Sequence, residues 1–215
     1  MNAFLDISVL RQLIKDCPPE VYRQSEIKTL KTGEILFCQG ETSQYVYIIL
    51  KGNLKAYLCN PLGAKYFLLI QHAGQIVGEV ETLLGGMPYI GTLEAIEDST
   101  VLAVPQPMYE RWLSEDHRFS LYVHKLLCNN FYLLIKKSAE DGLYPLKYRL
   151  MNLLGYLHGE DGPIQKKLLV ETLGATEQSV EQILGELTEK GIAECRDGVI
   201  KVLSIDLLNK EFWLS

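Results

Sequence analysis

The polar residues between Glu177 and Gln182 have the side chains that read base edges in a DNA groove. Glutamine can form two hydrogen bonds with adenine, and glutamate can accept a hydrogen bond from the amino group of cytosine. The segment contains Glu177, Gln178, Glu181 and Gln182. Cations and hydroxyls, which contact phosphates, occur close by in the sequence; they are Lys166, Lys167, Thr176, Ser179, Arg196 and Lys201. The spacing therefore predicts a base-facing helix with phosphate-contacting residues around it.

The apolar residues around this segment predict the two helices that hold it. Leu168, Leu169 and Leu173 lie on one face of a short first helix, and Gly174-Ala175-Thr176 makes a tight turn. The second helix, Glu177 to Glu189, has the helical spacing of a core-facing stripe, formed by Val180, Ile183, Leu184 and Leu187. We expect the Thr176 hydroxyl to cap this helix by accepting a bond from an unpaired backbone N–H.

A hairpin is expected directly after the second helix. Asp197-Gly198 separates two short apolar runs, Ile192–Cys195 and Val199–Val202. Asp-Gly between such runs is the strongest short-range hairpin signal, because both turn residues must adopt a positive φ. Two helices and a hairpin in this order predict a winged helix-turn-helix.

Short strands dominate the first half of the chain. From Leu30 to Val104, apolar runs alternate with glycines, a spacing typical of a sandwich or closed roll. The expected strands are Glu34–Cys38, Tyr45–Leu50, Leu54–Cys59, Lys65–Ile70, Gln75–Gly78, Gly91–Ala95 and Ser99–Val104. Such a roll can enclose a small ligand, or its interior can be filled by its own side chains.

A long helix is expected between the two halves. After the short helix Met108–Leu113, apolar residues recur every three or four positions from Phe119 to Lys137; they are Phe119, Tyr122, Val123, Leu126, Leu133 and Leu134, with Asn130 among them. This seam predicts a two-helix dimer interface in which Asn130 fixes the register. The alternative is a helix packed on its own roll. Asp141-Gly142 is expected to end the helix as a hinge, and Pro145 to open the next helix.

Composition restricts the class of protein. The chain has 215 residues and a net charge of −6, so a basic footprint for DNA must come from the local distribution of charge. No apolar run approaches the roughly 20 residues that span a bilayer, and the amino terminus lacks a signal pattern. A cytoplasmic location and no membrane partner are therefore expected. Five dispersed cysteines suit reduced thiols.

Catalytic motifs are missing from the sequence. Its four histidines are dispersed, and there is no Ser-His-Asp order, metal-ligand cluster or phosphate loop, so we expect neither an enzyme nor a metal site. The expected organisation is α+β in three parts: a β-roll sensor domain at 1–107, a central dimerisation helix with its hinge at 108–141, and the winged helix-turn-helix at 142–215.

The order of β-roll (jelly roll), long helix and winged helix-turn-helix resembles the Crp/Fnr superfamily of bacterial transcription regulators. The residues that carry the resemblance are Gly33-Glu34-x-x-Phe37-x-x-Gly40-Glu41, Tyr47-x-x-Leu50-x-Gly52, Gly74-x-x-x-Gly78-Glu79, Ala95-x-Glu97-Asp98-Ser99, Arg149-Leu150, and Leu173-Gly174 through Gly191-Ile192. The resemblance implies a homodimer on double-stranded DNA with two-fold related half-sites. It also implies a small-molecule effector in a cyclic-nucleotide-binding-like roll, and RNA polymerase as a candidate partner.

The roll departs from the pattern of cyclic-nucleotide-binding members. In those members, Gly-Glu is followed by Arg-Ser/Thr-Ala, and the arginine pairs with the cyclic phosphate. Here Gly78 and Glu79 are present, but the later positions are Tyr89, Ile90 and Gly91, and no arginine occurs between Arg23 and Arg111. A buried phosphate needs a cationic partner, so cyclic AMP is not expected. We expect Glu79 either to contact a neutral or cationic effector or to cap the turn.

The second helix, Glu177 to Glu189, also departs from the pattern of typical members of this superfamily. Typical members place arginine and glutamate on its exposed face, whereas the matching positions here are Glu177, Gln178 and Gln182, with Glu181 between them. Because the two glutamates repel phosphates, an A·T-biased operator with weak or effector-dependent affinity is expected. The competing expectation is a degenerate cyclic-nucleotide-binding-like module that acts through protein contacts instead of DNA.

Other sensing chemistries find little support. Iron–sulfur members carry a tight amino-terminal cysteine cluster, but this chain has only Cys17 there. Haem-sensing members use a histidine or cysteine in the roll, and His72 before a turn is more typical of a structural residue. A thiol switch between Cys17 and Cys195 would need the two sulfurs within bonding distance, which the sequence does not show.

Overall fold

The computed structural model describes residues 7–61, 63, 65–158 and 164–214. The described chain divides into two compact units. The first comprises residues 1–64 and 68–134, and the second residues 65–67 and 135–215. The division falls within one long helix, and each unit is described separately below.

Two antiparallel four-stranded sheets form the roll, as the glycine-punctuated strand pattern predicts. One sheet has the order β1-β8-β3-β6 and the other β2-β7-β4-β5. Their bounds are β1 (Glu26–Leu30), β2 (Ile35–Phe37), β3 (Tyr45–Lys51), β4 (Asn53–Cys59), β5 (Lys65–His72), β6 (Ile76–Val77), β7 (Thr92–Ala95) and β8 (Ser99–Pro105). Strands β3 and β8 pair through the centre of the first sheet, with Ile48 opposite Leu102. Both residues are buried in the roll.

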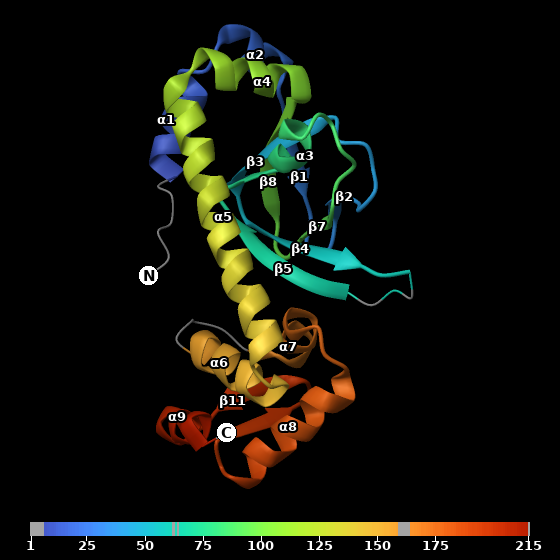
Figure 1. The fold of residues 1–215 in the computed structure, drawn as a ribbon, viewed down its shortest axis with the longest axis vertical. Helices are drawn as coiled ribbons and strands as arrows, with labels where there is room; N and C mark the ends of the chain where they lie inside the picture. Colours follow the sequence, from blue (N-terminus) through green and yellow to red (C-terminus); the bar gives the residue numbers. More distant parts are fainter. Residues whose placement is uncertain (1–6, 62, 64, 159–163, 215) are drawn as a thin grey trace. The chain divides into compact units, whose positions relative to one another are not determined.

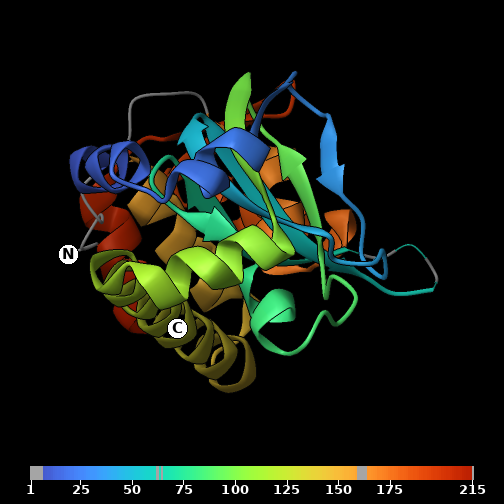
Figure 2. The ribbon, with the colours of Figure 1, turned by 90° about the horizontal axis from the view of Figure 1, so that it is seen from above.

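Four helical segments pack together against this roll, as Figures 1 and 2 show. They are α1 (Ile7–Lys15), α2 (Pro19–Gln24), α4 (Gln106–Glu115) and the first half of α5 (His117–Leu143). A shared core holds them to the strands, and in it the rings of Trp112 and Phe119 stack 3.7 Å apart, both fully buried. The short helix α3 (Glu79–Leu83) follows β6.

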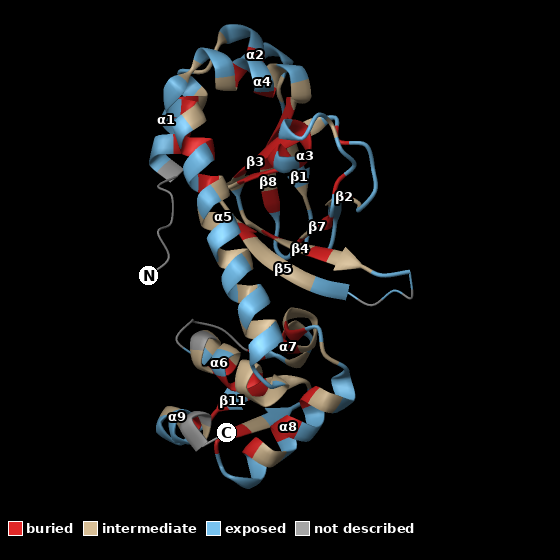
Figure 3. Ribbon diagram, viewed as in Figure 1, coloured by how far each residue is buried: buried red, intermediate tan, exposed pale blue. Residues whose placement is uncertain are grey.

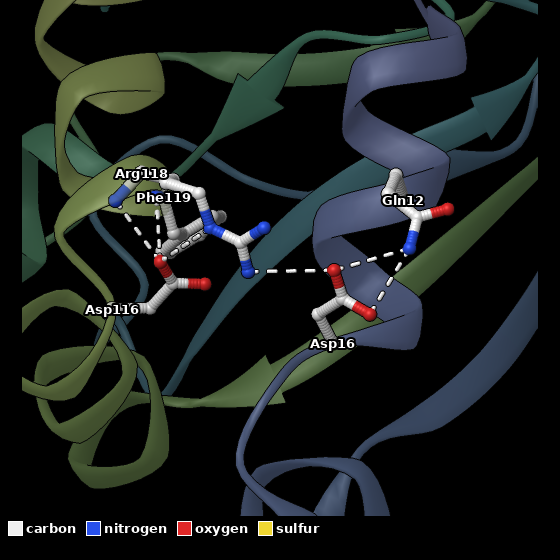
Figure 4. Close-up of polar contacts among 5 residues, drawn as sticks. All are labelled: Gln12, Asp16, Asp116, Arg118 and Phe119. Carbon is white, nitrogen blue, oxygen red and sulfur yellow. Dashed lines mark hydrogen bonds and ion pairs between the residues drawn. The ribbon is translucent and has the colours of Figure 1, made fainter.

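A small polar cluster fixes the start of α5 next to α1 (Figure 4). Asp116 precedes the helix, and its Oδ1 accepts hydrogen bonds from the backbone N–H groups of Arg118, at 2.9 Å, and Phe119, at 3.3 Å. These are amide groups that the helix itself cannot pair. The Arg118 guanidinium also reaches Asp16, the residue after α1, at 3.3 Å, and Gln12 of α1 donates to the same carboxylate.

Helix α5 is longer than the sequence predicts, because it runs through Asp141-Gly142 to Leu143. The helix break expected at this dipeptide is therefore wrong. Asp141 is held in the helix by Lys137 one turn earlier, at 2.9 Å, and by Arg149 at 2.6 Å. The helix ends just before Pro145 instead, since a residue that precedes proline disfavours the helical conformation.

The second unit is a small helical domain with a three-stranded sheet. Its elements are α6 (Leu146–His158), β9 (Ile164–Gln165), α7 (Lys166–Leu173), α8 (Glu177–Glu189), β10 (Ala193–Arg196), β11 (Val199–Val202) and α9 (Ile205–Leu214). Strand β9 pairs with β11, so the expected two-stranded wing has a third strand. The core-facing stripe of α8 packs with Leu150 and Leu154 of α6. The winged helix-turn-helix is thus present, and the α+β fold class is confirmed.

Arg149 joins three segments of this unit. Its guanidinium pairs with Asp141 at the end of α5 and donates to the backbone carbonyl of Leu173, the last residue of α7, at 3.2 Å.

Among the described residues, no helix is both long enough and apolar enough to cross a membrane.

Candidate DNA-binding surface and ligand cavity

Helix α8 begins at a capped turn, as the sequence predicts. Gly174 adopts a left-handed conformation at the end of α7, with φ of 60°, which a glycine accepts without the penalty of a Cβ. Thr176 then caps α8, its hydroxyl accepting a bond from the Ser179 backbone N–H at 3.2 Å. The polar residues Glu177, Gln178, Glu181 and Gln182 are all exposed on this helix. Figure 3 shows exposed positions along α8 in pale blue.

Lys166 is engaged with these same glutamates. Its Nζ lies 2.7 Å from Glu177 Oε1 and 2.5 Å from Glu181 Oε1. Hydrogen bonds to the two carboxylates raise the pKa of Lys166 above its ordinary value. The lysine expected to contact a phosphate therefore neutralises part of the acidic face of α8 instead.

The remaining expected phosphate contacts form a mixed rim. Lys167 and Arg196 are strongly exposed, but both have a carboxylate nearby. Arg196 Nη2 lies 3.0 Å from Glu194 Oε2, and Lys167 Nζ lies 3.9 Å from Glu171 Oε1. Lys201 is exposed on β11. Thr176 and Ser179 bond each other through their hydroxyls at 2.8 Å. Positive and negative side chains thus alternate around the two helices and the wing, and exposed pairs of this kind are screened by salt and individually weak.

A cavity of about 490 Å³ lies in the first unit. Its walls come from both sheets, from α3 and from α5, and are mainly aliphatic and aromatic. The lining residues that matter for its chemistry are Gln71, Glu79, Glu81, Asn130 and Phe131. This volume is in the range of small-molecule sites.

Residues of the predicted effector site meet at this cavity. Gly78, Glu79, Ile90 and Gly91 line it, whereas Tyr89 lies outside the described lining. The Tyr89 ring instead stacks on Phe37, with 3.8 Å between centroids, and its hydroxyl donates to the Tyr45 carbonyl. Gly78 has φ of 82°, and a Cβ there would lie 3.0 Å from the Tyr45 carbonyl oxygen. The strand-to-helix turn below the cavity therefore needs glycine.

Two buried carboxyl groups lie at this cavity. Glu79 is 4% exposed and Glu81 7% exposed. Glu81 Oε1 accepts a hydrogen bond from the Ile90 backbone N–H at 2.9 Å. Burial, with a smaller contribution from the neighbouring Glu81, raises the pKa of Glu79 to about 8, because an apolar surrounding disfavours the charged form. At neutral pH the Glu79 carboxyl group therefore holds a proton.

Comparison with known proteins gives three results. Residues 27–116 match the cyclic nucleotide-binding domain family. The chain is 24% identical over 189 residues to the cyclic AMP receptor protein of Thermus thermophilus, covering 83% of this chain and 84% of that protein. The crystal structure of a putative transcriptional regulator of the Crp/Fnr family from Eubacterium rectale superposes with a TM-score of 0.80 at 15% identity, over 94% of this chain and 98% of that one.

The chain has the Crp/Fnr fold. The resemblance inferred from its sequence motifs is confirmed, and the relatives matched along most of the chain are regulators rather than enzymes. A lysophospholipase of Coccidioides immitis is 27% identical over 113 residues, which are 53% of this chain but only 7% of the enzyme.

A cyclic nucleotide does not fit the Crp/Fnr roll of this chain. No lysine, arginine or histidine lines the cavity within the described residues, and two carboxyl groups do. An anionic phosphate would then be buried without a cation and next to like charges, which is costly. The family ligand and the residues of this roll therefore disagree.

The predicted dimer seam lies mainly in the protomer's own core. Phe119, Tyr122, Val123 and Leu126 are at most 5% exposed and pack against the roll. Asn130 and Leu134 line the cavity, and Leu133 is half-buried. The stripe read from the sequence is thus the side of α5 that faces its own sheet.

A different face of α5 carries the exposed apolar residues. Leu121 and Tyr132 are 47% and 67% exposed, and Cys128 is exposed between them. Sequence reasoning missed this face because its apolar residues are interleaved with Lys125 and His124. It also missed Gln71 as a cavity residue, since one glutamine in an apolar strand gives no periodic signal.

The titration of Glu79 predicts how stability depends on pH. Its pKa is raised in the folded protein, so the folded state binds more protons than the unfolded state between about pH 4.5 and 8, and stability falls as pH rises through this window. The substitution Glu79→Gln removes this dependence. We expect the variant to gain stability over the natural chain at pH 8.5, with little gain at pH 4.5, in urea unfolding followed by circular dichroism.

The exposed substitution Glu189→Gln is the matched control, because it makes the same chemical change on the surface of α8. Parallel stability-against-pH curves for Glu79→Gln and the natural chain would contradict the assignment.

Proposed function

We propose that the chain is a homodimeric transcription regulator that binds DNA through α8 and is controlled by an effector in the roll cavity. The observation that carries the proposal is the capped, exposed α8 with Gln178 and Gln182 on its surface, supported by a wing. Glutamine has the bidentate geometry for adenine, so an A·T-biased operator is expected.

Weak intrinsic affinity follows from the charges of this surface. Lys166 compensates Glu177 and Glu181, but one cation against two carboxylates leaves α8 acidic. Affinity for DNA depends on phosphates neutralised by lysine and arginine, and the rim supplies Lys167, Arg196 and Lys201. Two copies on one duplex double these contacts, which is why a dimer matters more here than in a basic protein.

The exposed apolar face of α5 supports the homodimer. Leu121, Cys128 and Tyr132 are spaced by seven and four residues, which places them on one side of the helix. A water-exposed row of this kind is unfavourable in a monomer, and packing it against a second copy of α5 removes the apolar surface from water.

The cavity supports effector control because α5 forms part of its wall. Leu127, Asn130 and Phe131 come from the same helix turns as the exposed face. A ligand that contacts these residues therefore acts on the helix that would carry the dimer contacts.

Selection of bound sequences from random DNA duplexes tests the function directly. We expect enrichment of a two-fold related, A·T-biased site. The substitution Gln182→Ala should then relax the preference at one base pair in each half-site, at a cost of about 1–3 kcal/mol of discrimination. Affinities for the selected site and for its single-base variants measure this, with Gln24→Ala on the exposed surface of α2 as control. An unchanged preference profile would remove Gln182 from base reading.

The acidic pair on α8 predicts a gain of affinity. Changing both Glu177 and Glu181 to glutamine removes two negative charges and frees Lys166 for a phosphate. On a random-sequence duplex we expect tighter binding and a steeper salt dependence, by about 0.9 in log–log slope for each added phosphate contact. Fluorescence anisotropy titrations at several salt concentrations measure both. The same titrations on Glu189→Gln provide the reference, and an identical slope for the double variant would mean that α8 stays away from the duplex.

The dimer surface predicts the effect of a charge on α5. Leu121→Glu buries two carboxylates if two helices meet there, so the dimer dissociation constant should rise by roughly 100-fold or more, from the loss of two leucines at about 1.5 kcal/mol each. Sedimentation velocity measures the change. Leu207→Glu makes the same substitution at a 41% exposed leucine of α9. Equal dissociation constants for the two variants would rule out this face.

The acidic surface of α8 also favours a second candidate function. Exposed Glu177 and Glu181 fit a basic protein partner as readily as they oppose a phosphate backbone. No enriched duplex for the natural chain, together with none for the variant lacking both carboxylates, would favour this protein-binding module.

A further inference from the structure

The walls of the roll cavity suit an apolar molecular body. Leucine, isoleucine and phenylalanine side chains dominate the lining, among them Leu58, Leu68, Leu69 and Leu134. Burying apolar area against such walls contributes about 25 cal/mol for each Å² removed from water. A volume near 490 Å³ admits a molecule of drug-like size or smaller.

The charged groups at the cavity have one sign only. Glu79 and Glu81 are both more than nine-tenths buried, and no cationic side chain lines the cavity within the described residues. Burying a carboxylate in a low-dielectric site is costly without a compensating positive charge. The site is therefore short of one positive charge.

Two amide oxygens add a second, independent observation. Gln71 Oε1 and Asn130 Oδ1 are buried and have no hydrogen-bond partner among the described residues. Both residues line the cavity, and Gln71 is only 6% exposed. A buried acceptor left unpaired costs about 1–3 kcal/mol, so these atoms call for a donor from a ligand. Phosphates and carboxylates have no donors to offer when ionised.

We propose that the roll cavity binds a hydrophobic ammonium ion, a small molecule with an apolar body and one protonated amine. The ammonium group supplies the missing positive charge to Glu79 and Glu81, and its N–H groups donate to the carboxyl oxygens and to Gln71 Oε1 or Asn130 Oδ1. The apolar body fills the space between the leucines. This assignment rests on the proposed function for the role of the cavity as an effector site.

Binding replaces the proton on Glu79 with the positive charge of the ammonium ion. At neutral pH the Glu79 carboxyl holds a proton. When the ammonium ion enters with its own proton count unchanged, Glu79 loses its proton to the buffer, and the ligand's charge replaces it. The other titratable groups that act on Glu79 are Glu81, on the same helix, and Tyr109 of α4. Tyr109 stays neutral, because burial raises its pKa.

Isothermal titration calorimetry with one alkyl chain and three head groups tests this. The probes are n-octylamine, 1-octanol and octanoate, each kept below the concentration at which it aggregates. At pH 7 we expect octylammonium to bind at one site per chain, at least tenfold more tightly than octanol, and octanoate not to bind. Titrations in phosphate and in Tris, which differ in ionisation enthalpy, should report the release of about one proton for each bound ammonium ion, and none at pH 9.5.

Glu79→Gln separates the charge from the shape of the site. We expect this variant to lose at least tenfold in affinity for octylammonium and to lose the proton release, while octanol binding changes little. Glu189→Gln, in the second unit, should match the natural chain. If Glu79→Gln does not fold, Asn130→Leu is the second variant, and it should weaken octylammonium and octanol alike.

Three outcomes would overturn the proposal. These are octanoate binding as tightly as octylammonium, equal binding of octanol and octylammonium with no proton release, and binding of several octylammonium ions per chain that Glu79→Gln leaves unchanged. None of them bears on DNA binding, which the duplex selection measures without a ligand. Conversely, a chain that selects no duplex can still bind the amine with proton release.

Discussion

Three environments meet along one helix, and the architecture depends on how α5 divides its surface among them. Because a helix turns 100° at each residue, positions three and four apart share a side. On one side, Phe119 and Leu126 near the start of the helix are buried against the strands. Further along the same side, Asn130 and Leu134 line the cavity. The opposite side, with Leu121 and Tyr132, is open to water. The helix is therefore the only element described here that touches the core, the cavity and the exposed apolar face together.

Carboxylates have opposite surroundings in the two units. On α8, Glu177 and Glu181 are exposed to water and share Lys166, in ion pairs that are individually weak. In the roll, Glu79 and Glu81 are buried without a cation among the described lining residues, and burial raises the pKa of Glu79 to about 8. The net charge of −6 thus includes carboxyl groups in two distinct environments, one exposed beside a lysine and one buried in an apolar cavity.

The elements that could be predicted from the sequence are those specified by residues close together in the chain. Helix α8 was predicted with its observed bounds, because Thr176 and the leucine stripe specify it locally. Strand β1 and helices α1 to α3 were not predicted: β1 exists through its pairing with β8, a contact that spans some seventy residues of chain. The stripe on α5 was found, but apolar spacing does not say whether its partner is the same chain or another. The unpaired oxygens of Gln71 and Asn130 can be recognised only in the folded chain, because their surroundings come from segments that are distant in the sequence.

The stacked pair of Trp112 and Phe119 gives the roll an optical reporter. Trp112 is fully buried and its indole nitrogen has no hydrogen-bond partner among the described residues, so its emission should be blue-shifted, as for indole in a dry solvent. Phe119 lies on α5, two turns before the first residue of that helix to line the cavity. Any shift of α5 on its sheet would change the ring contact, and in a Trp213→Phe background the emission of a single tryptophan would follow that movement without an added dye.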